Sequence, residues 1–181
     1  MFKILDEVCK PKRSTKYSAY VDLFARENVT ISAGETKVIP LGVKLDINKI
    51  NKIVSESFYY KEDNDLDFAG TRDKFMKSHY LEVALRSSLG VKGLTIPNGI
   101  GIIDLDFADE IGLIMYNPLK KPSITFDKNN IKATFKMSFG DDFTIKKGDK
   151  VAQCTLKEHK SYLMGYESEV VRDGGFGSTG K

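Results

Sequence analysis

Hydrophobic and polar residues alternate with a period of two in several short stretches of this 181-residue chain. The alternating segments are residues 36–47, 81–85, 111–116 and 131–137. Successive side chains of a strand point to opposite faces, so the alternation predicts half-buried strands. Glycines separate the segments at short intervals, and no strand–helix–strand rhythm is present. The pattern therefore indicates an all-β sandwich, jelly roll or barrel.

Two segments interrupt this pattern. In residues 48–61 the apolar residues recur at helical spacing, and an acidic, turn-rich stretch at 62–65 follows. We expect a short helix and then a loop. Residues 120–140 carry two strand-like runs around Asp127–Asn130, which predicts an added hairpin.

The length of the chain is that of one domain, which would bury about 70% of the surface that the unfolded chain exposes. Residues 164–181 lack hydrophobic periodicity. We therefore expect a single β domain over residues 1–163, followed by a mobile C-terminal arm.

Composition narrows the class of protein. The chain is 41% hydrophobic, with no apolar run near 18 residues and no charged-then-apolar leader, so we expect a soluble, cytoplasmic protein without a membrane anchor. Cys9 and Cys154 lie far apart and lack CxxC spacing, which predicts reduced, buried thiols and no zinc site. The net charge of +3, from 28 basic and 25 acidic residues, is too balanced for direct nucleic-acid binding.

Several short fragments carry candidate chemistry, and each also has an ordinary structural explanation. Arg86-Ser87-Ser88-Leu89-Gly90 follows a predicted strand, where it could cradle a phosphate or simply cap a helix. If their strand continues, Asp104 and Asp106 lie on one face of it and Phe107 lies on the other. Such a pair of carboxylates could bind a metal ion or activate water. The alternative is a solvated strand end. Gln153 and Asp22 could be a ligand-binding amide and carboxylate, or ordinary polar residues of their strands.

The last ten residues of the chain place four glycines around Phe176, with Ser178 and Thr179 nearby. Free amides and hydroxyls suit a phosphate, and the aromatic ring suits a planar base. A polar terminus that binds nothing is the alternative explanation.

Taken in order, five fragments resemble the motifs of the trimeric dUTP diphosphatase (dUTPase) family: SAYVDLFA, LRSSLGVKGL, NGIGIIDLDFADEIGL, KGDKVAQ and GGFGSTG. The resemblance implies a jelly-roll-like (β-clip) subunit in a homotrimer, with three active sites at subunit junctions. The arm would close over a neighbouring subunit's site. The implied reaction is Mg²⁺-dependent hydrolysis of dUTP to dUMP and pyrophosphate, which keeps uracil out of DNA and supplies dUMP.

The third motif implies the catalytic and base-reading residues. Asp104 would be the base that activates water for in-line attack on the α-phosphorus. Phe107, where the family commonly has Tyr, would stack on the deoxyribose and exclude a ribose. Asn98 would read the uracil edge, and hairpin backbone that includes Gly101 and Ile103 would complete the recognition.

The other motifs imply the phosphate and metal contacts. The resemblance assigns the phosphates to Arg86, Ser87, Ser88 and Gln153, and it assigns Mg²⁺, held through water, to Asp22.

In the arm, Phe176 would cap the uracil, while Gly177, Ser178 and Thr179 would hold the β- and γ-phosphates. Arg172 lies one residue nearer to GGFGSTG than the family's arginine does.

Three features depart from the family pattern. Tyr20-Val21 stands where Gly-Tyr is usual, and residues of about 49–78 and 120–140 exceed the usual short connections. Two alternatives therefore stay open: a dCTP deaminase of the same fold, and an interaction module that docks a regulatory protein through 49–78. Asn98 and the complete GGFGSTG favour the dUTPase.

Overall fold

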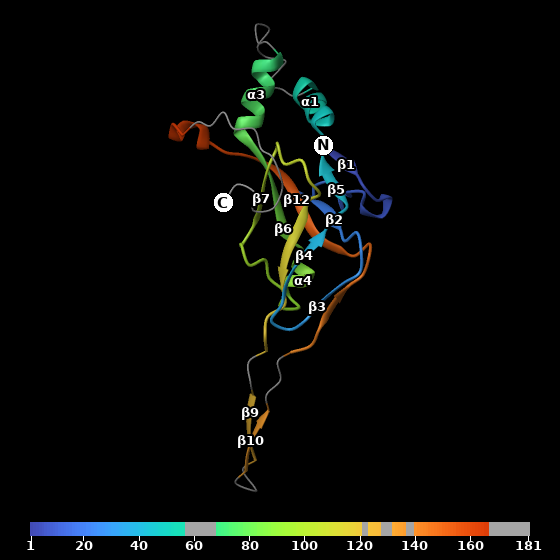
Figure 1. Ribbon diagram of the computed structural model, residues 1–181, viewed down its shortest axis with the longest axis vertical. Helices are drawn as coiled ribbons and strands as arrows, with labels where there is room; N and C mark the ends of the chain where they lie inside the picture. Colours follow the sequence, from blue (N-terminus) through green and yellow to red (C-terminus); the bar gives the residue numbers. More distant parts are fainter. Residues whose placement is uncertain (57–67, 121–122, 128–131, 137–139, 167–181) are drawn as a thin grey trace.

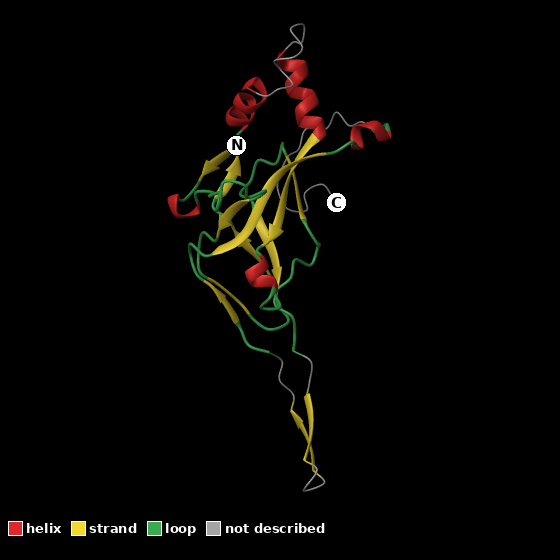
Figure 2. Ribbon diagram, turned by 180° about the vertical axis from the view of Figure 1, so that it is seen from behind, coloured by secondary structure: helices red, strands yellow, loops and turns green. Residues whose placement is uncertain are grey.

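A computed structural model of the chain describes residues 1–56, 68–120, 123–127, 132–136 and 140–166. Strands form most of the regular structure in these ranges. A β body lies in the middle of the molecule, two helices lie at one end, and a hairpin projects from the other end (Figures 1 and 2).

The largest sheet has four antiparallel strands in the order β2-β12-β6-β7. The strands are β2 (Val21–Phe24), β12 (Lys150–Glu158), β6 (His79–Leu85) and β7 (Gly101–Asp104). In β6, Leu81 and Val83 belong to the main core, as their place in the alternating pattern predicts. This sheet carries four of the five motifs, because each of the first four lies on one of its strands or directly beyond the end of one.

Three two-stranded pairs complete the body. Strand β1 (Phe2–Ile4) pairs with β5 (Val43–Leu45), β3 (Val29–Ile31) with β11 (Phe143–Ile145), and β4 (Thr36–Pro40) with β8 (Gly112–Tyr116). Three short helical turns follow β1, β6 and β12: η1 (Glu7–Cys9), α4 (Ser87–Gly90) and η2 (Ser161–Met164). The predicted all-β class is confirmed.

The predicted segment 36–47 forms two strands, β4 and β5, which are separated by Leu41 and Gly42. Gly42 has a φ of 63°, and a Cβ there would lie 2.5 Å from the Sγ of Cys9. Glycine at this break accommodates both the left-handed φ and the close approach of Cys9. Cys9 and Cys154 are both buried free thiols, as predicted.

The first insertion is more helical than its sequence indicates. Helix α1 spans Ile47–Glu56, which confirms the start of the predicted helix, while the expected turn at 62–65 lies outside the described residues. A further helix, α3 (Phe68–Ser78), was not predicted and leads directly into β6. The two helices share a small core with Leu105, separate from the main one.

The second insertion is the predicted hairpin. Strands β9 (Ser123–Asp127) and β10 (Lys132–Lys136) pair in antiparallel register and extend away from the body (Figure 2). The tip of the hairpin and residues 167–181 lie outside the described residues. Across the part of the chain that is described, no helix has the length and apolar character needed to span a membrane.

Candidate active site

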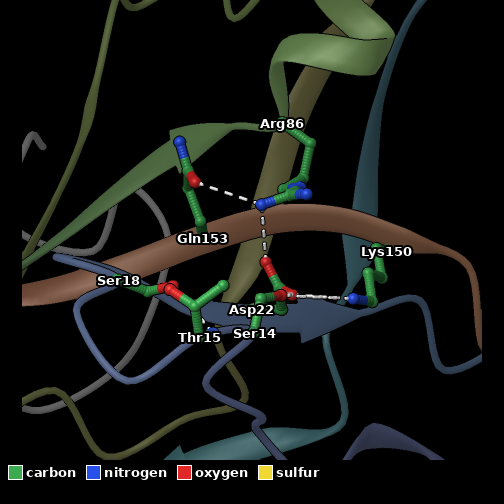
Figure 3. Close-up of polar contacts among 7 residues, drawn as sticks. All are labelled: Ser14, Thr15, Ser18, Asp22, Arg86, Lys150 and Gln153. Carbon is green, nitrogen blue, oxygen red and sulfur yellow. Dashed lines mark hydrogen bonds and ion pairs between the residues drawn. The ribbon is translucent and has the colours of Figure 1, made fainter.

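A cluster of charges surrounds Asp22 on the central sheet (Figure 3). The Asp22 side chain is only 3% exposed. Its Oδ1 accepts a bond of 2.7 Å from Arg86 Nη1, and its Oδ2 lies 2.9 Å from Lys150 Nζ. Ser14 Oγ donates to Oδ2 at 2.5 Å. Two cations therefore meet one carboxylate, which leaves a positive surplus at this position.

The environment of Asp22 keeps its carboxyl group ionised. Burial alone would raise the pKa of Asp22. The hydrogen bonds from Ser14 and Lys150 and the positive charges of Arg86 and Lys150 lower it by more, so the pKa lies below its usual value. Bonds to the charged form of a carboxyl group favour that form. Asp22 therefore acts here as a fixed anion that orients the two cations.

Arg86 lies where β6 ends, and its guanidinium is shared between two partners. Nη1 bonds Asp22 and also donates to Gln153 Oε1 at 3.4 Å, while the backbone N–H of Arg86 donates to Val151 at 3.1 Å. The Nε atom is buried and has no hydrogen-bond partner among the described residues. Three predicted site residues, Asp22, Arg86 and Gln153, are thus in contact.

Ser87 and Ser88 are exposed at the start of α4. The N-cap of this helix is Arg86, with no side-chain cap bond, so neither serine has the ordinary capping role that the sequence left open. Ser88 and Lys150 line a cavity of about 230 Å³ beside the cluster, together with Lys92 and Asp149. The exposed hydroxyls and nearby cations suit a phosphate.

The predicted base-reading residues lie around a different cavity. Asn98, Gly101 and Ile103 line a space of about 170 Å³ between β7, β8 and the loop that precedes β7. At Gly101 the strands approach so closely that a Cβ would lie 3.1 Å from Val83 Cβ and 3.2 Å from the Val83 carbonyl oxygen. The glycine therefore allows β7 to lie against β6 at the wall of this cavity.

Asp104 is the last residue of β7 and is exposed. A turn follows at once, closed by a bond of 3.0 Å from the Phe107 N–H to the Asp104 carbonyl oxygen. The strand does not continue to Asp106, although that side chain is also exposed. Phe107 is 7% exposed and belongs to the main core, so its contact with a sugar stays a prediction.

Asp104 and Arg86 lie at opposite ends of β6. Asp104 pairs with Tyr80, and Arg86 follows six residues later along the same strand direction. At ~3.3 Å per residue this separates them by roughly 20 Å. A single chain therefore brings Asp22, Arg86 and Gln153 together, but it does not bring Asp104 close to Arg86.

Some predicted site residues lie outside the part of the chain that the structure describes, and the sequence did not predict some of the contacts that it shows. Arg172, Phe176, Gly177, Ser178 and Thr179 belong to the arm beyond residue 166. Lys150 and Ser14 were not predicted. Lys150 lies in the KGDKVAQ motif, but only the pairing of β12 with β2 places its side chain beside Asp22.

The side chains around Asp22 determine whether this position can hold a metal ion. Among the residues that the structure describes, no group of three or more His, Cys, Asp or Glu side chains forms a metal site. Asp22 already accepts three contacts, and an ionised carboxylate offers about four lone-pair sites. Asp22 therefore has about one lone-pair site left, which a water of a hydrated ion such as Mg²⁺ could occupy.

Known proteins are similar to this chain in both sequence and fold. No family model matches it. The deoxyuridine 5′-triphosphate nucleotidohydrolase of Rickettsia felis is 28% identical over 177 residues, which cover 94% of this chain and 87% of that protein. The enzyme of the same name from Rickettsia prowazekii is also 28% identical over the same shares.

Solved structures agree with these relatives. The dUTPase from Streptococcus mutans superposes with a TM-score of 0.55 and 22% identity, over 87% of this chain and 94% of that one. The dUTPase of the Staphylococcus aureus phage phi11 has a TM-score of 0.54 and 20% identity, over 98% and 97%. This chain is therefore similar to dUTP nucleotidohydrolases in sequence over nearly its full length, and it shares the fold of solved dUTPases.

Proposed function

We propose that this protein hydrolyses dUTP to dUMP and pyrophosphate. The observation that carries the proposal is the placement of Asp104 directly after Ile103, which lines the cavity with Asn98 and Gly101. An exposed carboxylate beside a recess of this size suits a base that acts next to a bound nucleotide. The near full-length similarity to dUTP nucleotidohydrolases names the nucleotide. The same similarity favours the hydrolase over the deaminase alternative.

In the proposed reaction, the Asp104 carboxylate accepts a proton from water. The water oxygen bonds to the α-phosphorus, and the bond from that phosphorus to the oxygen bridging to the β-phosphate breaks. Pyrophosphate leaves with the electron pair of that bond. Positioning of the attacking water supplies much of such a rate enhancement.

The phosphates would be held at the Asp22 cluster. Arg86 is fixed by Asp22 and Gln153, so it can meet a phosphate without first losing side-chain freedom. Ser87, Ser88 and Lys150 add donors at the same position. Mg²⁺ bound to the phosphates would neutralise their charge, and Asp22 would contact it through water.

A neighbouring structure supports magnesium in this fold. A mutant of the phi11 phage dUTPase was solved with a structural Mg(II) ion. That statement concerns the phage protein. For this chain the role of Mg²⁺ rests on the donor chemistry around Asp22.

The separation of Asp104 from Arg86 supports a homotrimer with shared sites. Since Asp104 and Arg86 lie roughly 20 Å apart on one chain by the strand rise, a complete site needs Asp104 from one copy and Arg86 from another. We propose that the arm of residues 164–181 then closes over the site, with Phe176 on the uracil.

A second role is proposed for the first insertion. Helices α1 and α3 lie at one end of the molecule, beyond the β body, and share a small core with Leu105 (Figure 1). Phage dUTPases of the same fold are described as controlling the transfer of virulence genes. A protein partner of this chain would dock on α1 and α3, and a pull-down that retains every partner after deletion of residues 52–77 would contradict this role.

The hydrolase proposal is tested by mixing the purified chain and Mg²⁺ with dUTP, dCTP, UTP or dTTP and measuring pyrophosphate. Release from dUTP alone is expected, because the recess would exclude the other bases and the ribose. No release from dUTP would end the proposal. Ammonia release from dCTP would instead indicate the deaminase.

A further inference from the structure

Leu105 connects the predicted catalytic residue with the helical insertion. It directly follows Asp104 and is 4% exposed, whereas Asp104 and Asp106 on either side of it are exposed. Its neighbours in the core are Ile50 and Val54 of α1 and Phe75 of α3. The insertion therefore buries the residue next to the predicted base.

The same turn has a second anchor in a different core. Phe107 packs in the main core of the β body, and its N–H closes the turn onto the Asp104 carbonyl oxygen. Leu105 packs in the small core of the insertion. The backbone that carries Asp104 is thus held from two sides, by two clusters that have no buried residue in common.

The insertion itself is attached firmly enough to hold a turn. Asp46 Oδ1 accepts bonds from the N–H groups of Asn48 and Lys49 at the start of α1, and Lys49 Nζ donates to the Phe2 carbonyl oxygen at 2.6 Å. Helix α3 runs without interruption into β6, whose Tyr80 pairs with Asp104. The Ser78 carbonyl oxygen at this junction accepts a bond of 2.7 Å from the His159 N–H.

We propose that Leu105 is a positioning residue for Asp104, and that α1 and α3 support the catalytic turn. Apolar packing suits this purpose, since a close-packed contact transmits small displacements. The role of Asp104 as base rests on the proposed function, but the support of the turn by the helices does not. A decoration on the surface of the subunit would have no such effect on the turn.

The test compares cavities of equal size in the two cores. Ile50→Ala opens a cavity in the small core, and Ile31→Ala in β3 opens one in the main core; both isoleucines are 0% exposed. Strand β3 lies far from α1 in the body (Figure 1). Leu105→Ala removes the anchor itself, and Leu105→Met keeps its volume. The Ile50→Val and Ile31→Val pair repeats the comparison with a milder change if an alanine variant does not fold.

Two measurements are made on each folded variant. Steady-state hydrolysis of dUTP separates kcat from KM, and hydrogen exchange follows the Phe107 amide, which reports the turn without any need for activity. Leu105→Ala and Ile50→Ala should speed this exchange and lower kcat by about 10- to 100-fold, the loss expected for a small misplacement of a catalytic group. KM should stay within about twofold, and Leu105→Met should restore most of kcat.

Three other results would contradict parts of this proposal. Exchange at Phe107 that stays at the wild-type rate in both Leu105→Ala and Ile50→Ala overturns the support by the helices. Faster exchange with unchanged kcat overturns the positioning role of Leu105. A wild-type chain without dUTP hydrolysis defeats the proposed function alone, because the exchange measurement still decides whether the insertion holds the turn.

Discussion

The two ends of the central sheet hold their functional residues by different forces. At one end, Asp22 is bonded by Arg86, Lys150 and Ser14, and charge sets the geometry. At the other end, Asp104 lies on a turn whose neighbours Leu105 and Phe107 are buried in apolar cores. Ion pairs respond to pH and to loss of a partner, whereas apolar packing responds to volume.

The difference fits the work proposed for each end. A phosphate site must hold its cations in fixed positions, and the buried Asp22 carboxylate does so for Arg86 and Lys150. A base must keep its distance to the water that it activates, so its backbone must not move. Substitutions at the two ends should therefore give distinct signatures.

The largest effect is expected for Asp104→Asn. Loss of a general base lowers kcat by about 10²- to 10⁴-fold, while the amide keeps the size of the carboxyl group. Pyrophosphate release measures kcat, and titration with a non-hydrolysable dUTP analogue measures binding, which should change little. A variant with near-normal kcat would remove Asp104 from the mechanism.

Asp22→Asn should mainly affect stability and phosphate binding. The neutral amide leaves Arg86 and Lys150 without their anion, and hydrogen bonds to charged groups contribute about 1.5–3 kcal/mol. We expect the free energy of unfolding in urea to fall by about 2 kcal/mol, together with a higher KM. Unchanged unfolding would show that the cluster contributes nothing to stability.

Gly101→Ala tests the close approach of β7 to β6. The new methyl would lie 3.1 Å from Val83 Cβ and 3.2 Å from its carbonyl oxygen, so we expect a loss of about 1–2 kcal/mol in unfolding free energy, as for other overpacked sites. Gly70→Ala in α3 is the matched control, because nothing lies within 4 Å of its Cβ position. That change should leave stability equal or raise it by up to about 1 kcal/mol. Equal effects of the two substitutions would contradict the account of β7.

The smallest expected effect is the acid response of the Asp22 cluster. In the folded chain the pKa of Asp22 lies below the ordinary value of 3.8. Its ion pairs therefore stabilise the fold above the unfolded pKa, and this stabilisation is lost as the pH falls through the folded pKa. Between neutral pH and about pH 3, wild type should therefore lose stability that Asp22→Asn has already lost. Leu105→Ala, in contrast, should lower stability by the same amount at both pH values. Urea unfolding at the two pH values measures both differences.

Local pattern predicted much of the fold. Strands β6, β8 and β10 lie where the alternation of period two places them, and α1 begins where helical spacing begins. Helix α3 was missed, because the segment FAGTRDKFMKS has little apolar periodicity and is stabilised by Phe75 packing in the small core. The pattern also placed residues 36–47 in one strand, whereas a left-handed φ at Gly42 divides it into β4 and β5.

The candidate site divides in the same way. Asp22, Arg86 and Gln153 could be named from their motifs, and the structure brings them into contact. Lys150 could not be assigned to Asp22, since that contact depends on the register between β12 and β2. Leu105 gave no signal in the sequence, where it is one apolar residue between two aspartates.

Strand alternation, glycine punctuation and the order of five motifs were sufficient to predict the fold class and to indicate the dUTPase resemblance, because each is a local property of the chain. Sheet register and packing decided the rest. They place Asp104 and Arg86 at opposite ends of β6, gather two cations on Asp22, and bury Leu105 under α1 and α3. Such contacts join residues far apart in sequence, and their free energy depends on distances that only the folded chain has.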